Sequence, residues 1–358
     1  MTVELSAAAA FATAGAVTLA GTPLAIAVAH RTGFLDYPRE YRRHHAPTPL
    51  LGGAALLLAV LVAAAVLGTS TKLLLVLGCA AGLWLVGTMD DRFAVAPKWR
   101  LIAEAGAAVA LFAAGLGWST ALSTPGDLVL TVVWVVGVVN AFNLMDNLDG
   151  ACSAVAAVTA AGIGVLAAIR GQVAVATLAF ALSGGCVGFL RWNLARPARI
   201  FLGDGGSMPI GFLVAALAMA TARHASAGNA GVLVGALLAG LPIFDATLVS
   251  VSRVRRGVTL VTGGRDHLTH RIQLALGSPQ PVALALALAQ TGLCALAIVG
   301  YELGNPALAG FGCAVFLAGV VAILVLDRAR WRPAGIAMGA PPSTVEPAIE
   351  VPVGVDPG

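Results

Sequence analysis

Eleven long apolar stretches dominate this chain, and each is about as long as a helix that crosses the ~30 Å hydrocarbon core of a bilayer. The stretches are solidly apolar and do not alternate with polar residues, which argues against a transmembrane β-barrel. The segments between them leave no room for a soluble domain. We therefore expect an all-α, polytopic membrane protein with about eleven transmembrane helices, at residues 5–29, 50–68, 72–88, 99–117, 128–144, 151–169, 172–190, 206–222, 230–251, 281–300 and 306–326.

Composition supports this fold class. Only 11% of the residues are charged, whereas soluble domains carry roughly 25%. The high apolar content also excludes a disordered chain. We expect one transmembrane domain over residues 1–332 and a proline-rich, disordered cytoplasmic tail over residues 333–358. The five cysteines form no CxxC pair, so we interpret them as small core residues and not as disulfides or zinc ligands.

The basic residues are sorted by side. With eleven spans, 18 of the 21 Lys and Arg residues fall on the side of the loop at 30–49. Positive charge marks the cytoplasmic side of membrane proteins, which predicts an outer N-terminus and a cytoplasmic C-terminus. The net charge of +4 is thus mainly a topology signal. Nucleic-acid binding is not expected, because no basic face with interleaved aromatic residues is present.

Most acidic residues near the spans gather on the same side, and the orientation rule does not explain them, because acids contribute little to it. Carboxylates close to hydrocarbon are costly and usually have a partner or a task. We therefore expect an active site at the cytoplasmic face. The acids concerned are Asp90, Asp91, Asp146, Asp149, Asp204, Asp245 and Asp266.

Two of the polar segments combine carboxylates with amides or a cation. The segment DDRFAVAPKWRLIAE (90–104) offers two adjacent carboxylates and then Lys98 near a helix start. In NAFNLMDNLDG (140–150), Asn140, Asn143 and Asp146 share one helix face by their three-residue spacing. Such oxygens suit Mg²⁺ or the hydroxyls and amides of a nucleoside. The alternatives are a solvated loop for the first segment and a capping cluster for the second.

Three further segments are less specific on their own. FLGDGGSMPIG (201–211) could hold an anion at a helix N-terminus, but a Gly-rich loop before a helix is more often simply a tight turn, and this one lacks the Lys of a P-loop. Asp245 lies about 12 Å into its span, where an uncompensated carboxylate costs about 2.5–3.5 kcal/mol; an intramembrane ion pair is the alternative. The loop GGRDHLTHRI (263–272) has two histidines and two arginines that suit a pyrophosphate, or that simply face the cytoplasm.

These segments, together with the first cytoplasmic loop (36–53), resemble a known family in their order and sidedness. They are similar to the polyprenyl-phosphate N-acetylhexosamine-1-phosphate transferases, and most of all to the bacterial undecaprenyl-phosphate GlcNAc-1-phosphate transferases. The resemblance covers residues 36–272. It implies transfer of N-acetylhexosamine-1-phosphate, most often GlcNAc-1-phosphate, from a UDP-sugar to a polyprenyl phosphate, with release of UMP, as the first membrane step of cell-envelope glycan synthesis.

The resemblance also implies partners and residue roles. It implies Mg²⁺, with Mn²⁺ as an alternative, and a multi-pass position in the bacterial plasma membrane. The sequence leaves the oligomeric state open, with a homodimer as one option. The resemblance implies catalytic roles for Asp90 as the base, with Asp91, Lys98, His267 and His270. Substrate-binding roles fall to Asn140, Asp146, Asp149, Asp204, Arg265 and His44, and metal ligation to Asn143 and Asp245.

Some positions depart from the family pattern. Asn147 stands where many members have Gly, Met208-Pro209 replaces an apolar pair, and Glu104 stands where Gln is common. The loop reads DHLTH in place of three consecutive histidines, which favours the GlcNAc branch over the muramoyl-pentapeptide branch. Two other readings remain open at this point: a catalytically altered family member, and a transporter of a lipid-linked solute.

Overall fold

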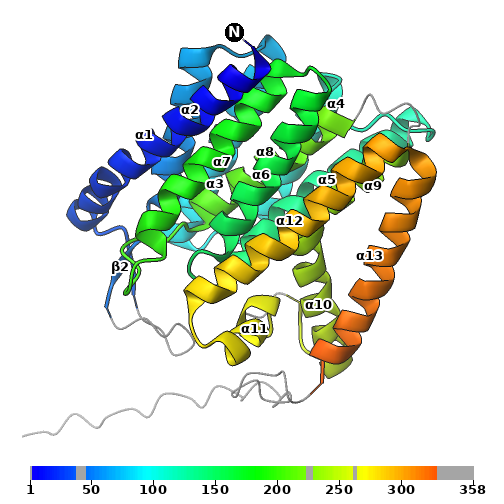
Figure 1. The fold of residues 1–358 in the computed structure, drawn as a ribbon. Coiled ribbons are helices and arrows are strands. Elements are labelled where there is room, and N and C mark those ends of the chain that lie inside the picture. Colours follow the sequence, from blue (N-terminus) through cyan, green and yellow to red (C-terminus); the bar gives the residue numbers. More distant parts are fainter. Residues whose placement is uncertain (1, 38–45, 223–228, 261–263, 329–358) are drawn as a thin grey trace, which may run out of the picture.

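The computed structural model describes residues 2–37, 46–222, 229–260 and 264–328. Within these ranges the chain forms thirteen helices and one pair of two-residue strands, arranged as a helical bundle (Figure 1). His44 and the tail at 333–358 lie outside the described residues. In chain order the elements are α1 (Val3–Thr32), β1 (Leu35–Asp36), β2 (Thr48–Pro49), α2 (Gly52–Leu67), α3 (Thr71–Phe93), α4 (Pro97–Ala113), α5 (Thr124–Met145), α6 (Ala151–Ile169), α7 (Val173–Asn193), α8 (Asp204–Ala222), α9 (Asn229–Leu238), α10 (Gly240–Arg256), α11 (Leu268–Leu276), α12 (Pro279–Leu303) and α13 (Asn305–Leu326).

The all-α, polytopic prediction is confirmed, with a smaller number of clear spans than eleven. Among the described helices, eight are long and apolar enough to cross a membrane, or nine if the bent pair α9–α10 counts as one span. The helix α2 has only 16 residues, and α4 has 17 and contains charged residues. Each predicted stretch nevertheless coincides with one helix, except 230–251, which is divided between α9 and α10.

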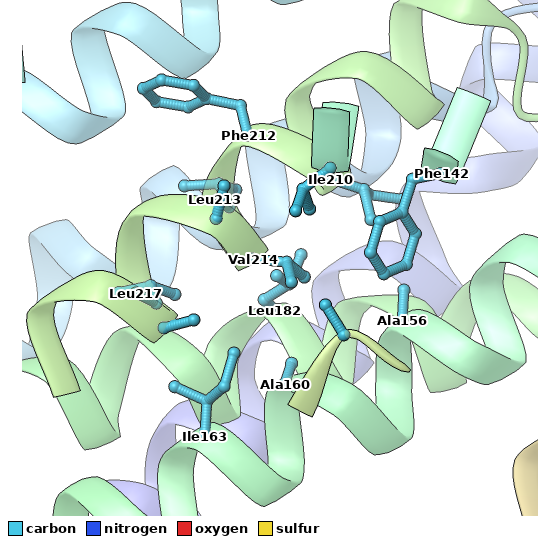
Figure 2. Close-up of a cluster of buried hydrophobic side chains, with 14 of the residues drawn as sticks. Phe142, Ala156, Ala160, Ile163, Leu182, Ile210, Phe212, Leu213, Val214 and Leu217 are labelled. Atoms are coloured by element: carbon cyan, nitrogen blue, oxygen red, sulfur yellow. The ribbon is translucent and has the colours of Figure 1, made fainter. Parts of the chain in front are cut away.

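Helix α8 forms the centre of the bundle. In its most apolar 18-residue window, 94% of the residues are buried, a larger share than in any other described span. It packs against α2, α3, α5, α6, α7 and α9. Figure 2 shows apolar side chains of α8 meeting those of its neighbours, among them Phe142 of α5, Ala156, Ala160 and Ile163 of α6, and Leu182 of α7.

The N-terminus of α8 is fixed by the segment that precedes α2. The amide of Phe201 donates to the carbonyl of Pro49 at 2.8 Å, and Gly52 and Gly53 donate to the carbonyls of Phe201 and Leu202. These three hydrogen bonds therefore hold the turn that precedes α8 against Pro49 and the start of α2. The C-terminal end of α1, the β1–β2 pair, α11 and the end of α13 lie at this same end of the bundle (Figure 1).

Candidate active site

A cluster of two carboxylates and one guanidinium joins three helices. Arg100 of α4 lies with one terminal nitrogen 2.7 Å from Asp90 Oδ2, in the last turn of α3, and 2.5 Å from Asp204 Oδ2, the first residue of α8. The three side chains are 15–26% exposed, so solvent reaches them. Two like charges this close need a cation between or beside them, and Arg100 provides it.

Asp91 holds the N-terminus of α8. Its two carboxylate oxygens accept hydrogen bonds from the backbone N–H groups of Asp204 and Gly205, each at 3.0 Å. These N–H groups are left free by helix geometry and carry partial positive charge, which favours an anion there. The anion at this turn is thus a carboxylate of the same chain, and the bonds fix Asp204 beside Asp90.

Amide side chains of α5 complete the cluster. Asn143 donates from Nδ2 to Asp204 Oδ1 at 2.8 Å and to Ser207 Oγ at 3.0 Å. One turn earlier, Asn140 donates from Nδ2 to Glu104 Oε2 at 2.6 Å, and Glu104 is buried. The i, i+3 spacing expected for the two asparagines therefore does place both amides toward the polar residues of α4 and α8.

The contact between α3 and α8 depends on glycine. A Cβ added at Gly87 would lie 2.3 Å from the carbonyl oxygen of Asp204. A Cβ at Gly205 would lie 2.5 Å from Thr88 Oγ1. The two helices therefore meet backbone to backbone directly beside Asp90 and Asp204.

A second polar cluster forms around Asp245, which is fully buried. Its Oδ2 lies 3.0 Å from His267 Nδ1, and its Oδ1 accepts the backbone N–H of Leu268 at 2.6 Å. Leu268 is the first residue of α11, so the carboxylate satisfies one of the free N–H groups at that helix N-terminus.

Buried ion pairs hold the loop between α10 and α11. Asp266 accepts hydrogen bonds from Arg253 at 3.0 and 2.9 Å and from Arg256 at 2.6 Å. Burial alone raises the pKa of Asp266, but the hydrogen bonds and charges of the two arginines outweigh it and lower that pKa to about 2. Asp266 is therefore ionised throughout the physiological range.

The same loop is tied to the end of α13. Arg271 is fully buried, and its Nε donates to the carbonyl of Asp266 at 2.8 Å. Its two terminal nitrogens donate to the carbonyl of Leu326 and, at 3.1 Å, to Ser252 Oγ. Helices α10, α11 and α13 thus support one another where the histidines lie, at the lower end of the bundle (Figure 1).

The remaining expected residues surround these clusters. Asp146, Asp149 and Arg265 are half-buried, and the turn that carries the first two reaches α11 through a hydrogen bond from Thr269 Oγ1 to Asn147 Oδ1. Burial, followed by the positive charges of Arg265 and His267, lowers the pKa of His270 to about 4, so its imidazole is neutral at pH 7. Lys98 is exposed, with its Nζ 5.4 Å from the centre of the Trp99 ring.

The structure divides the expected metal pair between the two clusters. Asn143 lies with Asp204, whereas both oxygens of Asp245 bind His267 and Leu268. In the described part of the chain, no three His, Cys, Asp or Glu side chains are arranged to hold a metal. Mg²⁺ in phosphate-processing sites commonly takes one or two carboxylates plus substrate oxygens, and the neighbouring side chains of Asp204 and Asn143 carry oxygens of this kind.

Three residues of the site were not expected from the sequence. Arg100, Ser207 and Glu104 each bond to an expected residue. The excess of carboxylates near the membrane does indicate that a cation must lie among them. It does not say that Arg100, rather than Lys98, is that cation, because the choice depends on how α4 packs against α8.

An apolar cavity of about 440 Å³ lies between α5 and α10. One lining residue, Ala141, follows Asn140 in the chain, and another, Ala246, follows Asp245. The cavity therefore runs along the apolar faces of the two helices that carry Asn140 and Asp245. Its lining consists of Leu130, Val133, Trp134, Gly137, Val138, Ala141, Ile243, Ala246, Thr247, Ser250 and Val251.

Comparison with known proteins identifies the family. The sequence profile of glycosyl transferase family 4 matches residues 73–222. A candidate glycosyltransferase of Streptomyces coelicolor is 35% identical over 84% of this chain and 72% of its own length. The decaprenyl-phosphate N-acetylglucosaminephosphotransferase of Mycobacterium leprae is 30% identical over 89% of this chain and 90% of its own length. The undecaprenyl-phosphate α-N-acetylglucosaminyl 1-phosphate transferase of Yersinia pestis is 28% identical over 77% and 79%. The chain therefore belongs to glycosyl transferase family 4, as a multi-pass membrane enzyme of the polyprenyl-phosphate N-acetylhexosamine-1-phosphate transferases.

Proposed function

We propose that this enzyme transfers GlcNAc-1-phosphate from UDP-GlcNAc to a polyprenyl phosphate at the cytoplasmic face of the bacterial plasma membrane. The observation that carries the proposal is the cluster of Asp90, Arg100, Asp204 and Asn143 beside an apolar cavity. The relatives named for GlcNAc-1-phosphate transfer to decaprenyl or undecaprenyl phosphate support the choice of sugar and acceptor.

The bond changes define what the site must do. An oxygen of the lipid phosphate attacks the β-phosphorus of the UDP-sugar, the bond from that phosphorus to the bridging oxygen breaks, and UMP leaves. Positioning and charge stabilisation supply most of the catalysis of phosphoryl transfer. A bound Mg²⁺ would supply charge neutralisation at the diphosphate, and Asp204 and Asn143 are the residues that would hold it.

The side chains then divide the remaining work. Asp90 is the candidate base that takes the proton of the lipid phosphate, and Arg100 keeps its carboxylate beside Asp204. Asp91 positions Asp204 through the N-terminus of α8. Lys98, which is exposed, can reach a phosphate at the membrane surface.

Nucleotide and sugar contacts fall to the second cluster and its surroundings. Asp149 would bind the uracil, with Asp146, Asn140 and His44 as further substrate contacts. Arg265, His267 and His270 would bind the diphosphate or the sugar. Asp245 holds His267 and the start of α11 in place for this purpose.

The cavity between α5 and α10 suits the first isoprene units of the acceptor. Its lining is mainly apolar, and two of its residues, Ala141 and Ala246, directly follow Asn140 and Asp245 in the chain. Burying prenyl methylenes there stabilises the complex by about 0.8 kcal/mol per CH₂. The lipid chain would thus bind in the apolar cavity, and its phosphate would bind at the charged residues of the polar clusters.

The test is UMP release by purified enzyme with polyprenyl phosphate, Mg²⁺, and UDP-GlcNAc, UDP-GalNAc or UDP-MurNAc-pentapeptide in parallel. We expect turnover with UDP-GlcNAc. Asp90→Asn should lower kcat by about 10²–10⁴-fold, the usual contribution of a general base. Glu302→Gln, which changes an exposed carboxylate of α12, should leave the rate unchanged. Normal turnover by Asp90→Asn would refute the assignment of the base, and turnover only with another sugar would refute the substrate.

A further inference from the structure

The break between α9 and α10 leaves backbone N–H and carbonyl groups without hydrogen-bond partners in their own helices. The two helices meet at Ala239 with a bend of 79°. Helix ends have free carbonyl and N–H groups, and in hydrocarbon each such group must find a partner inside the protein. The partners at this break therefore determine whether the bend is stable.

Three of the first four residues of α10 show how its N–H groups are satisfied. Pro242 has no N–H and so removes one of them. Ile243 donates to the carbonyl of Ala239 at 3.2 Å. Leu241 donates to Gln290 Oε1 at 3.2 Å, which is a side chain of another helix.

Gln290 binds both sides of the break. Its Nε2 donates to the carbonyl of Leu238, the last residue of α9, at 2.6 Å, while its Oε1 accepts from Leu241. The side chain is fully buried in α12. One amide thus satisfies one acceptor that α9 leaves and one donor that α10 leaves, and so links the two helix ends.

Helix α10 transmits this geometry to the candidate site. Asp245 lies one turn after Leu241, and the cavity-lining residues Ile243, Ala246 and Thr247 belong to the same two turns. A change in the tilt of α10 would therefore move one wall of the cavity against α5. It would move the far wall, which belongs to α5, much less.

We propose that Gln290 is a positioning residue that holds α10 at the angle required for the acceptor cavity. The proposal rests on the proposed function for its kinetic consequence, because the cavity is there assigned to the polyprenyl chain. It does not rest on that function for its structural consequence, which is the distance between α10 and α5.

The structural test measures that distance directly. Spin labels at Val129→Cys of α5 and Val254→Cys of α10, both exposed positions outside the cavity lining, report it by double electron–electron resonance. The exposed Cys313 and half-buried Cys79 are first replaced by Ser. We expect Gln290→Leu to shift or broaden the distance distribution. Thr291→Val, at the neighbouring exposed residue whose hydroxyl bonds only Ala287 of its own helix, should not.

The kinetic test separates the two substrates. Gln290→Leu should raise KM for polyprenyl phosphate about tenfold, in line with the loss of buried hydrogen bonds, and KM for UDP-GlcNAc less than about twofold. Gln290→Glu should remain close to wild type, because a buried carboxyl group stays protonated and can then both donate and accept as the amide does. If Gln290→Leu does not fold, Gln290→Asn, whose amide is too short to reach both groups, takes its place.

The outcomes distinguish this proposal from the proposed function. An unchanged distance distribution in the folded Gln290 variants overturns it, whatever the enzyme's activity. Equal changes in both KM values, or a Gln290→Glu variant as impaired as Gln290→Leu, also overturn it. A wild-type enzyme that fails to turn over UDP-GlcNAc refutes the proposed function, and the distance measurement still decides the role of Gln290.

Discussion

At the scale of single residues, the site is built from charges that satisfy one another before any substrate binds. Arg100 serves two carboxylates, and Asp91 binds backbone N–H groups. A substitution that removes one partner of such a partly buried pair leaves the other charge unpaired. The free energy lost in this way exceeds the net stabilisation that the intact pair contributes. Single substitutions here should therefore affect stability as well as turnover, and both need to be measured.

Asp266 gives a prediction for pH dependence. Its pKa is about 2 in the folded protein and about 3.9 in an unfolded chain. A lowered pKa stabilises the fold above pH 3.9, and this contribution, about 2 kcal/mol, is lost as the pH falls toward 2. Asp266→Asn should therefore lower the melting temperature at pH 6, and the gap to wild type should narrow between pH 4 and pH 2. A gap that stays constant over this range would contradict the assignment.

Residue identities could be predicted from the sequence far better than residue pairings. The asparagines of α5 and the carboxylates of α3 and α8 are recognisable because polar groups at span ends are unusual. That Asn143 lies with Asp204, and Asp245 with His267, depends on the packing of helices distant in sequence. Spacing along one helix carries no information about that packing.

At the scale of elements, the contact between α3 and α8 decides how close Asp90 and Asp204 can lie. Gly87 allows the two backbones to touch. Helix positions were predictable, since each apolar stretch except 230–251 coincides with one helix. The break at Ala239 was not predicted, although Gly240 and Pro242 are the residue types that interrupt helices.

Gly87→Ala should separate these two helices. The new Cβ would lie 2.3 Å from the carbonyl oxygen of Asp204, and backbone cannot move away as a flexible side chain can. We expect a loss of about 1–3 kcal/mol in stability, typical of overpacking, and at least a tenfold loss of UMP release. Gly82→Ala, on the same helix with open space around it, is the matched control and should leave both unchanged. Wild-type activity in Gly87→Ala would show that α3 and α8 are not held together this closely.

At the scale of the whole molecule, the distribution of charge predicts the orientation. The polar clusters lie at the end of the bundle where α11 and the end of α13 are found (Figure 1). The sequence assigns most of the Lys and Arg residues to the loops on this side, and positive charge of this kind marks the cytoplasmic side.

Reporter fusions test the orientation. Alkaline phosphatase fused after residue 122, in the connection between α4 and α5, should be active, because it would be exported. The same enzyme fused after residue 95, between α3 and α4, should be inactive, and green fluorescent protein at the C-terminus should fluoresce. Phosphatase activity at residue 95 with none at residue 122 would show the opposite orientation.

The central position of α8 has a consequence for biogenesis. A ribosome delivers helices to the membrane in order, so α2, α3, α5, α6 and α7 are inserted before the helix that they surround. Their contacts with α8 form only when that helix arrives. Asp90 and Arg100 likewise meet Asp204, which is translated about a hundred residues later, only at that stage. The first polar cluster of the candidate site therefore forms only after the eighth helix has been inserted among its neighbours.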